Sequence, residues 1–325
     1  MVIVADIGAT KTMVAAAQED SGRIAPASIR RYESGQYESF EAILEAYLAD
    51  VSITSSPLLC LGVAGVVHNN RCRVTYLPWT VDGRELKTRF RLTDAIVLND
   101  LVAAGYGLDD LPEAASETIM AASPVVNGDR ALISPGTGLG EAIIPCLSGK
   151  YHPLASEGGH ADFAPFDGMT RRLWEFTRRS RPRVAVEDFL CGQGLGRIFH
   201  FFTAENGMAP DDRMAARMND DPGLAVTSLA LDEQSPSAVQ AVQLFWDILA
   251  AEAGNMALMI LARGGIFIGG GMAPRLIPLL DKERFAARFS DKGPHEALLR
   301  GMPVKIVTDT HLPLYGAARH ILAAR

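Results

Sequence analysis

Three short apolar runs of this sequence each lead directly into a glycine-rich turn, and this pattern constrains the fold more than any other feature. The runs are Val2–Ile7, Ala131–Ser134 and Ile266–Ile268. Apolar runs of this length that end at turn residues are typical of buried strands. Glycines at the end of a strand let the backbone approach a ligand closely and point its amide groups at an anion. The pattern predicts a sheet-based chain whose turns suit phosphate groups.

The rest of the chain alternates strand-like runs with helical apolar spacing, which is the signature of an α/β fold. Further strands are expected at Met13–Ala17, Leu58–Val63, Ala95–Leu98 and Val304–Val307, and helices at Phe40–Leu48, Leu101–Leu108, Pro274–Leu280 and Tyr315–Ala323. The clearest helix begins at Pro236, with Ser235 as its expected cap. Its expected end is Gly264-Gly265, because glycine terminates helices.

Length and an internal similarity predict two lobes. A chain of 325 residues exceeds the ~100–200 residues of a typical domain. Its 48% hydrophobic and 21% charged residues are those of an ordinary globular protein. The strand that ends in Gly8-Ala9-Thr10 resembles the one that ends in Gly136-Thr137-Gly138, about one domain later. This similarity indicates two related lobes that close on a nucleotide.

Charge and cysteine usage exclude several classes of protein. A net charge of −7 argues against a nucleic-acid partner, and the short arginine clusters near Arg171 and Arg178 fit a solvated helix face. The four cysteines have neither the paired spacing of a disulfide framework nor that of a zinc site. No basic segment precedes Val2–Ile7, and no apolar run approaches the ~20 residues of a membrane span. We therefore expect a cytoplasmic protein without a membrane partner.

Asp6 ends the first predicted strand and leads into the turn Gly8-Ala9-Thr10-Lys11. A carboxylate in this place can hold Mg²⁺ through water, while the turn amides and the Thr10 hydroxyl can meet phosphate oxygens. An ordinary hairpin turn is the alternative, because Asp, Gly and Thr are common turn residues. The G-x-x-x-x-G-K-[ST] spacing of a Walker A loop is absent here.

Two later turns have a similar character. Gly136–Gly140 is a second candidate phosphate turn, in which Thr137 adds a hydroxyl beside Gly138. A dinucleotide-binding fingerprint is a poor interpretation, because no clear helix follows this turn. The third turn, Gly269-Gly270-Gly271, could accommodate the face of an adenosine. One such turn means little, but three turns that each follow a strand favour nucleotide binding.

Asn99-Asp100 follows the strand-like run Ala95–Leu98. Phosphoryl transfer to an alcohol needs a carboxylate within hydrogen-bond reach of the attacking hydroxyl, and the end of a strand is a rigid mount for it. The alternative is that Asp100 merely caps the helix Leu101–Leu108. Spacing alone leaves these two interpretations about level.

Glu157-Gly158-Gly159-His160 places a carboxylate and an imidazole on either side of two glycines, so both side chains can converge on one small polar ligand. Both groups can bond to vicinal hydroxyls, which is what a sugar presents. A metal site would need a third ligand that is not evident, and a lone histidine is more often structural. Glu187 by itself is interpreted as a surface glutamate.

Taken in order along the chain, these segments resemble bacterial glucokinases, which are hexokinase-type sugar kinases of the actin-like ATPase (ribonuclease H-like) fold. The resemblance covers essentially the whole chain, and Glu157–Pro165 is its most specific stretch. The other segments that carry it are Asp6–Thr10, Leu98–Asp100, Gly136–Gly140, Val186-Glu187, Gly192–Leu195, Gly265–Gly271 with Pro274-Arg275, and Phe289–Gly293. The resemblance implies two α/β lobes with a cleft between them, one of residues 1–108 with 311–325 and one of residues 109–310.

The resemblance also implies an activity, the ATP-dependent phosphorylation of glucose at its 6-hydroxyl to glucose 6-phosphate. Asp100 would be the general base, and the other sugar hydroxyls would be held by Asn99, Glu157, His160 and Glu187. Asp6 would act through Mg²⁺. The nucleotide would be bound by Gly8, Thr10, Lys11, Thr137, Gly138, Gly270 and Gly271. A homodimer is typical of the family.

Three departures from the family pattern stand out. Ala9 occupies a position where glycine is usual, and a positive φ there would cost roughly 1–2 kcal/mol. The segment Tyr76–Trp79 lacks the Asn-His that usually precedes its tryptophan, and Ser134-Pro135 replaces a glycine-containing lead-in. No cysteine cluster follows His160, so we expect no structural zinc.

Three other functions compete with the glucokinase interpretation. The first is a kinase for another hexose or an amino sugar. The second, a sugar-sensing regulator that lost catalysis, is disfavoured because nothing like a helix-turn-helix precedes Asp6 and because the chain is acidic. The third is an ATPase without a small acceptor. The pairing of Glu157 with His160 distinguishes a sugar kinase from the last of these.

Overall fold

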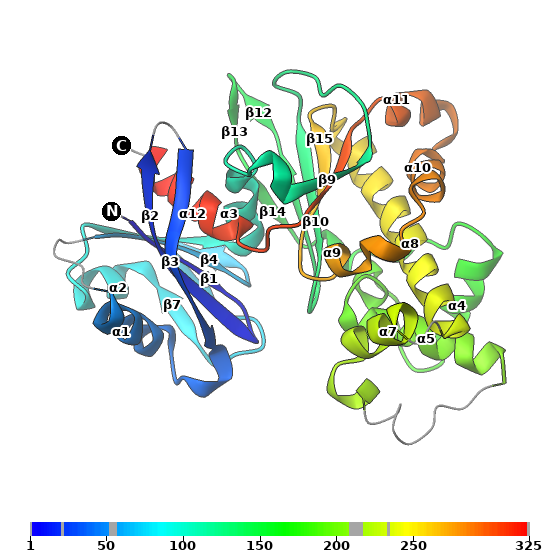
Figure 1. Ribbon diagram of the computed structural model, residues 1–325, viewed down its shortest axis with the longest axis horizontal. Coiled ribbons are helices and arrows are strands. Elements are labelled where there is room, and N and C mark those ends of the chain that lie inside the picture. The colour runs from blue at the N-terminus through cyan, green and yellow to red at the C-terminus, as the bar shows by residue number, and fades with distance from the viewer. Residues whose placement is uncertain (1, 21–22, 52–56, 208–216, 233–234, 324–325) are drawn as a thin grey trace. The chain divides into compact units, whose positions relative to one another are not determined.

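The structure is a computed structural model that describes residues 2–20, 23–51, 57–207, 217–232 and 235–323. The chain divides into two compact units. Unit 1 consists of Met1–Ala115, Tyr151–Ala155 and Asp309–Arg325, and unit 2 consists of Ser116–Lys150 and Ser156–Thr308. Both units combine strands with helices, as the α/β prediction requires (Figure 1).

Unit 1 is built on a sheet with the strand order β3-β2-β1-β4-β8. Its strands are β1 (Val2–Ile7), β2 (Lys11–Asp20), β3 (Arg23–Glu33), β4 (Leu58–Val63) and β8 (Asp94–Asn99). β1 pairs antiparallel with β2 and parallel with β4, which pairs parallel with β8. Ile7 lies opposite Val63, and Val63 opposite Asn99, so the carboxyl ends of these three strands share one edge of the sheet.

Helices cover both faces of this sheet, and neighbouring residues of β1 face different layers. Ile3 belongs to a buried cluster with Phe40 of α1 (Phe40–Asp50), whereas Val4 belongs to one with Leu314 of α12 (Leu312–Ala323). This explains why β1 is apolar from Val2 to Ala5, since a strand covered on both faces has no polar side.

The helix α3 (Asp100–Gly107) packs closely against α12 (Figure 1). A Cβ atom at Gly316 of α12 would collide with the carbonyl group of Ala103 in α3. The glycine therefore permits the close approach that buries Ala103 beside Leu314. Unit 1 also contains a small sheet of β5 (Val67–His68), β6 (Arg71–Arg73) and β7 (Thr80–Asp82), and the helix α2 (Gly83–Arg89).

Unit 2 repeats the strand pattern of unit 1. Five of its strands are β9 (Ser116–Met120), β10 (Arg130–Pro135), β11 (Leu139–Ile144), β15 (Gly265–Ile268) and β16 (Val304–Val307). They run in the order β11-β10-β15-β16-β9. β10 pairs antiparallel with β11 and parallel with β15, and β15 pairs parallel with β16, as in the series β2-β1-β4-β8. The similarity between the two glycine turns thus has a counterpart in topology.

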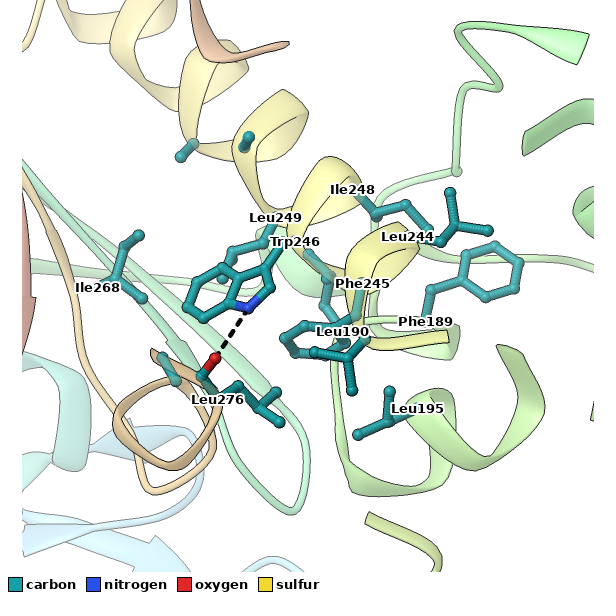
Figure 2. Packing of buried hydrophobic residues seen from close by; sticks show 14 of the residues in the cluster. Phe189, Leu190, Leu195, Leu244, Phe245, Trp246, Ile248, Leu249, Ile268 and Leu276 are labelled. Atoms are coloured by element: carbon teal, nitrogen blue, oxygen red, sulfur yellow. Dashed lines mark hydrogen bonds between the residues drawn. The ribbon is translucent and has the colours of Figure 1, made fainter. Parts of the chain in front are cut away.

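The long helix α8 (Pro236–Ile260) forms the centre of the core of unit 2 (Figure 1). Figure 2 shows Trp246 of α8, whose ring nitrogen donates a hydrogen bond of 3.3 Å to the carbonyl of Leu276. Phe189 and Leu190 pack into the same cluster. They directly follow the short 3₁₀ helix Val186–Asp188, so this apolar contact anchors the segment that carries Glu187.

The other helices of unit 2 surround this core, and short strands lie where the chain passes from one unit to the other. The helices are α4 (Gly168–Arg178), α5 (Gly192–Glu205), α7 (Pro222–Leu231), α9 (Ala273–Leu276), α10 (Lys282–Ser290) and α11 (Glu296–Arg300); the strands are β12 (Cys146–Leu147), β13 (Lys150–Tyr151) and β14 (Leu154–Ser156). Among the described segments, no helix has the length and apolar character needed to span a bilayer.

Three details of the predicted helices were wrong. Ser235 occupies the cap position of α8, but its side chain makes no capping hydrogen bond. α8 ends at Ile260 because Leu261 adopts the left-handed conformation with φ 50°, so glycine was not required there. Gly264 instead packs against the backbone of Gly128, where any side chain would collide. The helix predicted at Pro274–Leu280 is α9 followed by a separate 3₁₀ turn, Ile277–Leu279.

Candidate active site

The turn after β1 is a tight hairpin turn. The amide of Gly8 donates to the carbonyl of Lys11 at 3.0 Å, while Thr10 and Lys11 are exposed. The hydroxyl of Ser34, which is fully buried, donates to the carbonyl of Gly8 at 2.8 Å and lies 3.0 Å from the hydroxyl of Thr12. The prediction of a hairpin and that of a ligand-binding turn are therefore compatible. The buried hydroxyl of Ser34 holds the turn in place, while Thr10 and Lys11 remain exposed to a ligand.

Asp6 lies near the carboxyl end of β1, opposite Met13 and Gly62. Burial raises the pKa of its carboxyl group to about 6, although the charges of Lys11 and His311 lower it. A nearby cation favours the ionised form of such a group. Among the described residues, no three His, Cys, Asp or Glu side chains form a metal-binding group. Asp6 nevertheless fits Mg²⁺ bound with a nucleotide, which keeps several waters and takes only one or two carboxylates.

Ala9 does not carry the strain that its replacement of glycine suggested. Several non-glycine residues of the described chain have a positive φ, such as Asn70 and Tyr76, but Ala9 is not one of them. The expected penalty required a left-handed backbone at this position. The concern about Ala9 was therefore wrong, since alanine meets the backbone requirement of the turn.

Asn99 and Asp100 lie at the same sheet edge as Asp6, with β4 between their strands. The side-chain oxygen of Asn99 caps α3, because it accepts hydrogen bonds from the amides of Leu101 at 3.0 Å and Val102 at 3.2 Å. Its amide nitrogen donates to the carbonyl of Gly65 at 3.2 Å.

Asp100 is the first residue of α3 and is half-buried. One of its carboxylate oxygens accepts from the amide of Leu101 at 3.0 Å. The charge of Asp100 also adds to burial in raising the pKa of the Cys72 thiol to about 11. Since Asn99 occupies the cap position, the alternative that Asp100 is present as the helix cap loses its main support.

The turn after β10 is also closed by its own backbone. The amide of Gly136 donates to the carbonyl of Gly138 at 2.8 Å, and the amide of Gly192 donates to the carbonyl of Gly136 at 3.0 Å. Thr137, at the tip, is exposed. Because Gly192 is the first residue of α5, the positive end of that helix adjoins the turn, and such an end favours anions. As predicted, no helix follows this turn directly; β11 does.

The turn after β15 meets the turn after β10. Gly269 donates from its amide to the carbonyl of Ile133 at 2.8 Å, and Gly270 has a φ of 79°. A Cβ atom at Gly270 would collide with the carbonyl of Pro135. Glycine is thus required at Gly270 on two grounds, and the predicted nucleotide residues Thr137, Gly138 and Gly270 belong to adjacent loops of unit 2.

Glu187 and His160 come together in unit 2. Nδ1 of His160 lies 4.0 Å from Oε1 of Glu187, while the other carboxylate oxygen accepts a hydrogen bond of 2.7 Å from the amide of Leu139. The Glu187 side chain is only 23% exposed, so it is not the surface glutamate that its local sequence suggested. Glu157 is exposed and precedes the 3₁₀ turn Gly158–His160.

Several residues that support the site gave no local signal in the sequence. Arg183 donates to the carbonyl of His160 and pairs with Asp162. Asp188, next to Glu187, accepts from the amide of Ala185 at 2.9 Å and pairs with Arg181 at 3.0 Å. The pair Arg183 and Asp162 is 21 positions apart in the sequence, so only the fold reveals it. Glu141 is different, because a charge inside the apolar strand Leu139–Ile144 is visible in the sequence.

Each unit thus carries a different set of functional groups. Unit 1 holds two carboxylates, Asp6 and Asp100, at a sheet edge beside an open backbone turn. Unit 2 holds two glycine turns that suit phosphate and nucleoside, and the pair His160 and Glu187, which suits hydroxyl groups. Each set supplies groups of the kind that phosphoryl transfer to a polyol uses: a carboxylate base in unit 1, and backbone turns and hydroxyl-binding side chains in unit 2.

Known proteins resemble the chain over almost its full length. A sequence model of the glucokinase family, described as "Glucokinase", matches residues 3–324. The glucokinase of Nostoc sp. is 32% identical over 341 residues, which cover 100% of this chain and 99% of that protein. The crystal structure of a glucokinase from an Antarctic psychrotroph is 29% identical, with a TM-score of 0.86 over 99% of this chain and 98% of that one.

A ROK family glucokinase from Streptomyces griseus, crystallised with glucose and AMPPNP, is 20% identical. Its TM-score is 0.64 over 98% of this chain and 97% of that one, and at this identity the likeness shows the fold alone. The neighbours confirm the predicted actin-like ATPase fold class. With a family match that spans nearly all of its residues, the chain belongs to the glucokinase family.

Proposed function

We propose that this protein transfers the γ-phosphoryl group of ATP to the 6-hydroxyl of glucose, with Asp100 as the general base. The observation that carries the assignment of the base is positional. Asn99 occupies the cap position of α3, while Asp100 is the first residue of that helix and follows β8 at the sheet edge that also holds Asp6. The family match supports the reaction itself.

In this mechanism Asp100 accepts the proton of the 6-hydroxyl as that oxygen attacks the γ-phosphorus. A new P–O bond forms to the sugar, the bond to the β-phosphate oxygen breaks, and ADP leaves with the electron pair. A base acts through position more than through a shifted pKa in such reactions. Asp100 suits this task because it is fixed at the junction of β8 and α3.

The remaining sugar hydroxyls are assigned to Asn99, Glu157, His160 and Glu187. The contact of Glu187 with the amide of Leu139 leaves one of its oxygens near His160, an arrangement suited to paired bonds with vicinal hydroxyls. Both oxygens of a carboxylate can accept, so Glu187 can keep its internal bond while it binds sugar.

The nucleotide is assigned to three turns. Gly8, Thr10 and Lys11 of unit 1 and Thr137 and Gly138 of unit 2 would meet the phosphates, and Gly270 and Gly271 would lie by the nucleoside. Asp6 would hold Mg²⁺ through water, and the bound ion would supply positive charge at the phosphate oxygens. The ionised form of Asp6, which burial disfavours, would be restored by that charge.

The proposal also covers the cellular location and the oligomeric state of the enzyme. We infer a cytoplasmic homodimer, each protomer of which contains the two units described above. Free cysteines, three of them buried, suit a reducing compartment. Size-exclusion chromatography with light scattering tests the dimer directly.

A coupled assay of ADP release tests the reaction. Wild-type protein is given MgATP with glucose, mannose, fructose, N-acetylglucosamine or no sugar, and Asp100→Asn is measured beside it. We expect turnover that depends on glucose and that falls by about 10²–10⁴-fold in the variant. Asp94→Asn, at the opposite end of β8, is the matched control and should keep wild-type turnover. Turnover with a different sugar would change the substrate, and turnover without sugar would refute the kinase proposal.

A further inference from the structure

Glu141 is a buried acid that the proposed mechanism does not use. It lies within β11 and is only 3% exposed. Its Oε1 atom has no hydrogen-bond partner among the described residues. Buried polar groups are almost always paired, because an unpaired one loses its hydrogen bonds to water without replacement. A buried carboxyl group that is retained although one of its oxygens is unpaired therefore suggests a functional role.

The carboxyl group of Glu141 lies against the Glu157–His160 segment, next to Gly158. A Cβ atom at Gly158 would collide with Oε2 of Glu141, so the carboxyl group occupies the space that a side chain there would need. In the same way, a Cβ atom at Gly159 would come within 2.5 Å of the carbonyl of Leu139. Leu139 and Glu141 are two residues apart on one strand and therefore face the same side. Two successive inward-facing residues of β11 thus support two successive glycines.

This support reaches all three candidate sugar ligands of unit 2, Glu157, His160 and Glu187. The 3₁₀ turn Gly158–His160 is closed by bonds from the amide of His160 to the carbonyl of Glu157 at 3.0 Å and from the amide of Ala161 to that of Gly158 at 2.8 Å. Displacing Gly158 therefore moves the residues on both sides of it. Leu139 in turn donates to Glu187, so β11 aligns the second carboxylate as well.

We propose that Glu141 is a positioning residue for sugar binding, whose buried carboxyl group supports Gly158 and thereby fixes where Glu157 and His160 present their side chains. The proposal rests on the proposed function, because it takes these two residues as sugar ligands. It adds a residue outside the sugar site whose chemistry controls the affinity for the sugar.

The surroundings of Glu141 keep its carboxyl group protonated near neutral pH. The charged group that acts on it is Glu252 of α8, and together with burial it raises the pKa of Glu141 to about 8. Glu252 is itself raised in pKa by burial, although Asn255 and Lys292 lower it. From β14, Ser156 contributes an uncharged hydroxyl, which accepts from the amide of Gly158 at 2.9 Å. Ionisation would place a second negative charge beside Glu252, and among the described residues no cation acts on Glu141 to offset it.

The test compares three variants by steady-state kinetics and by hydrogen exchange. Glu141→Ala removes the support, Glu141→Gln keeps its shape without an ionisable proton, and Ile144→Ala shortens a buried side chain on the opposite face of the same strand. We expect Glu141→Ala to raise KM for glucose about tenfold while kcat and KM for ATP stay within about twofold. Glu141→Gln should match the wild type at pH 7, and between pH 7 and pH 9 only the wild type should lose affinity for glucose. Ile144→Ala should lower the melting temperature without changing KM for glucose.

Hydrogen exchange of the amides of His160 and Ala161 is measured in each protein at the same pH. It reports the position of the turn and does not depend on catalytic activity. Protection should fall in Glu141→Ala and persist in Glu141→Gln and Ile144→Ala. An unchanged KM for glucose in Glu141→Ala, or unchanged protection of these amides, would overturn the proposal. If wild-type protein proved inactive on glucose, the proposed function would fail on that result, while the exchange data would still decide whether Glu141 positions the turn.

Discussion

The hydroxyl group of Ser34 donates a hydrogen bond of 2.8 Å to the carbonyl of Gly8, which braces the first phosphate turn from behind. Ser34 is fully buried and also lies 3.0 Å from the hydroxyl of Thr12. Ser34→Ala removes the bond to the carbonyl of Gly8 and the polar neighbour of the buried Thr12 hydroxyl, so we expect a loss of about 1–3 kcal/mol in the free energy of unfolding. The turn should also loosen, which raises KM for ATP severalfold.

Ser39→Ala separates these two effects. Ser39 caps α1, where it accepts from the amide of Ala42, and its loss should cost about 1 kcal/mol. Urea unfolding should therefore detect both variants, whereas only Ser34→Ala should change KM for ATP. Equal KM values in the two variants would show that the brace has no bearing on the nucleotide.

Two substitutions of Glu187 separate the contribution of its charge to sugar binding from that of its hydrogen-bonding shape. Glu187→Ala deprives the amide of Leu139 of its acceptor and removes a charged partner of hydroxyl groups. Since hydrogen bonds to charged groups contribute about 1.5–3 kcal/mol, kcat/KM for glucose should fall at least about 10–100-fold. Glu187→Gln keeps an acceptor oxygen for Leu139 and should lose less. The prediction is contradicted if both variants lose the same activity, since the charge and the acceptor would then not be separable.

Ala9→Gly tests whether alanine is suited to the first phosphate turn. Ala9 does not have a positive φ, so glycine offers no relief of strain and adds freedom to the unfolded chain. We expect the variant to be less stable by about 0.4–1 kcal/mol in urea unfolding, with KM for ATP unchanged or higher. A variant with higher stability and a lower KM would mean that the turn favours glycine after all.

Glu141 should make stability depend on pH in a defined direction. Its pKa is about 8 in the folded protein against an ordinary 4.5, so the folded state holds a proton that the unfolded state releases between these values. The contribution of this group to stability is therefore largest below about pH 4.5 and falls as pH rises toward about 8.

Glu141→Gln cannot ionise and should escape this loss. A difference of one in pKa corresponds to about 1.4 kcal/mol, so relative to wild type the variant should gain about 1–3 kcal/mol between pH 5 and pH 8 after relaxation of the site. Urea unfolding at three pH values measures this gain. Glu45→Gln, an exposed change of the same charge, is the control. Parallel pH profiles for wild type and Glu141→Gln would contradict the prediction.

The sequence predicted strands better than it predicted how helices end. Val2–Ile7, Leu58–Val63 and Val304–Val307 have their predicted bounds, because a run buried on both faces admits few alternatives. The end of α8 depended on Leu261 adopting a left-handed backbone, for which its side chain gives no indication. The close approach of Gly264 to Gly128 likewise arises from tertiary packing.

For the candidate site, residues beside each other in sequence were easier to interpret than residues brought together by the fold. The turn after β1 and the Asn99-Asp100 pair could be recognised locally, though which of the pair caps α3 required the structure. The residues around Glu187 in the sequence predict a surface position, and its hydrogen bond to Leu139 forms only when the 3₁₀ helix Val186–Asp188 lies beside β11. The roles of these residues in binding stay predictions.

Unit 1 is assembled from both ends of the chain, and this has a consequence for its synthesis. Its sheet and α3 are encoded before residue 116, whereas α12, which covers them, spans Leu312–Ala323. During synthesis on the ribosome, most of unit 2 emerges before α12 does. The helix α3, which carries Asp100, therefore lacks its packing partner until α12 has emerged. Until then the apolar face around Val4 and Ala103 is exposed to other nascent chains. We expect phosphorylating activity to arise only after α12 has left the exit tunnel and packed against α3.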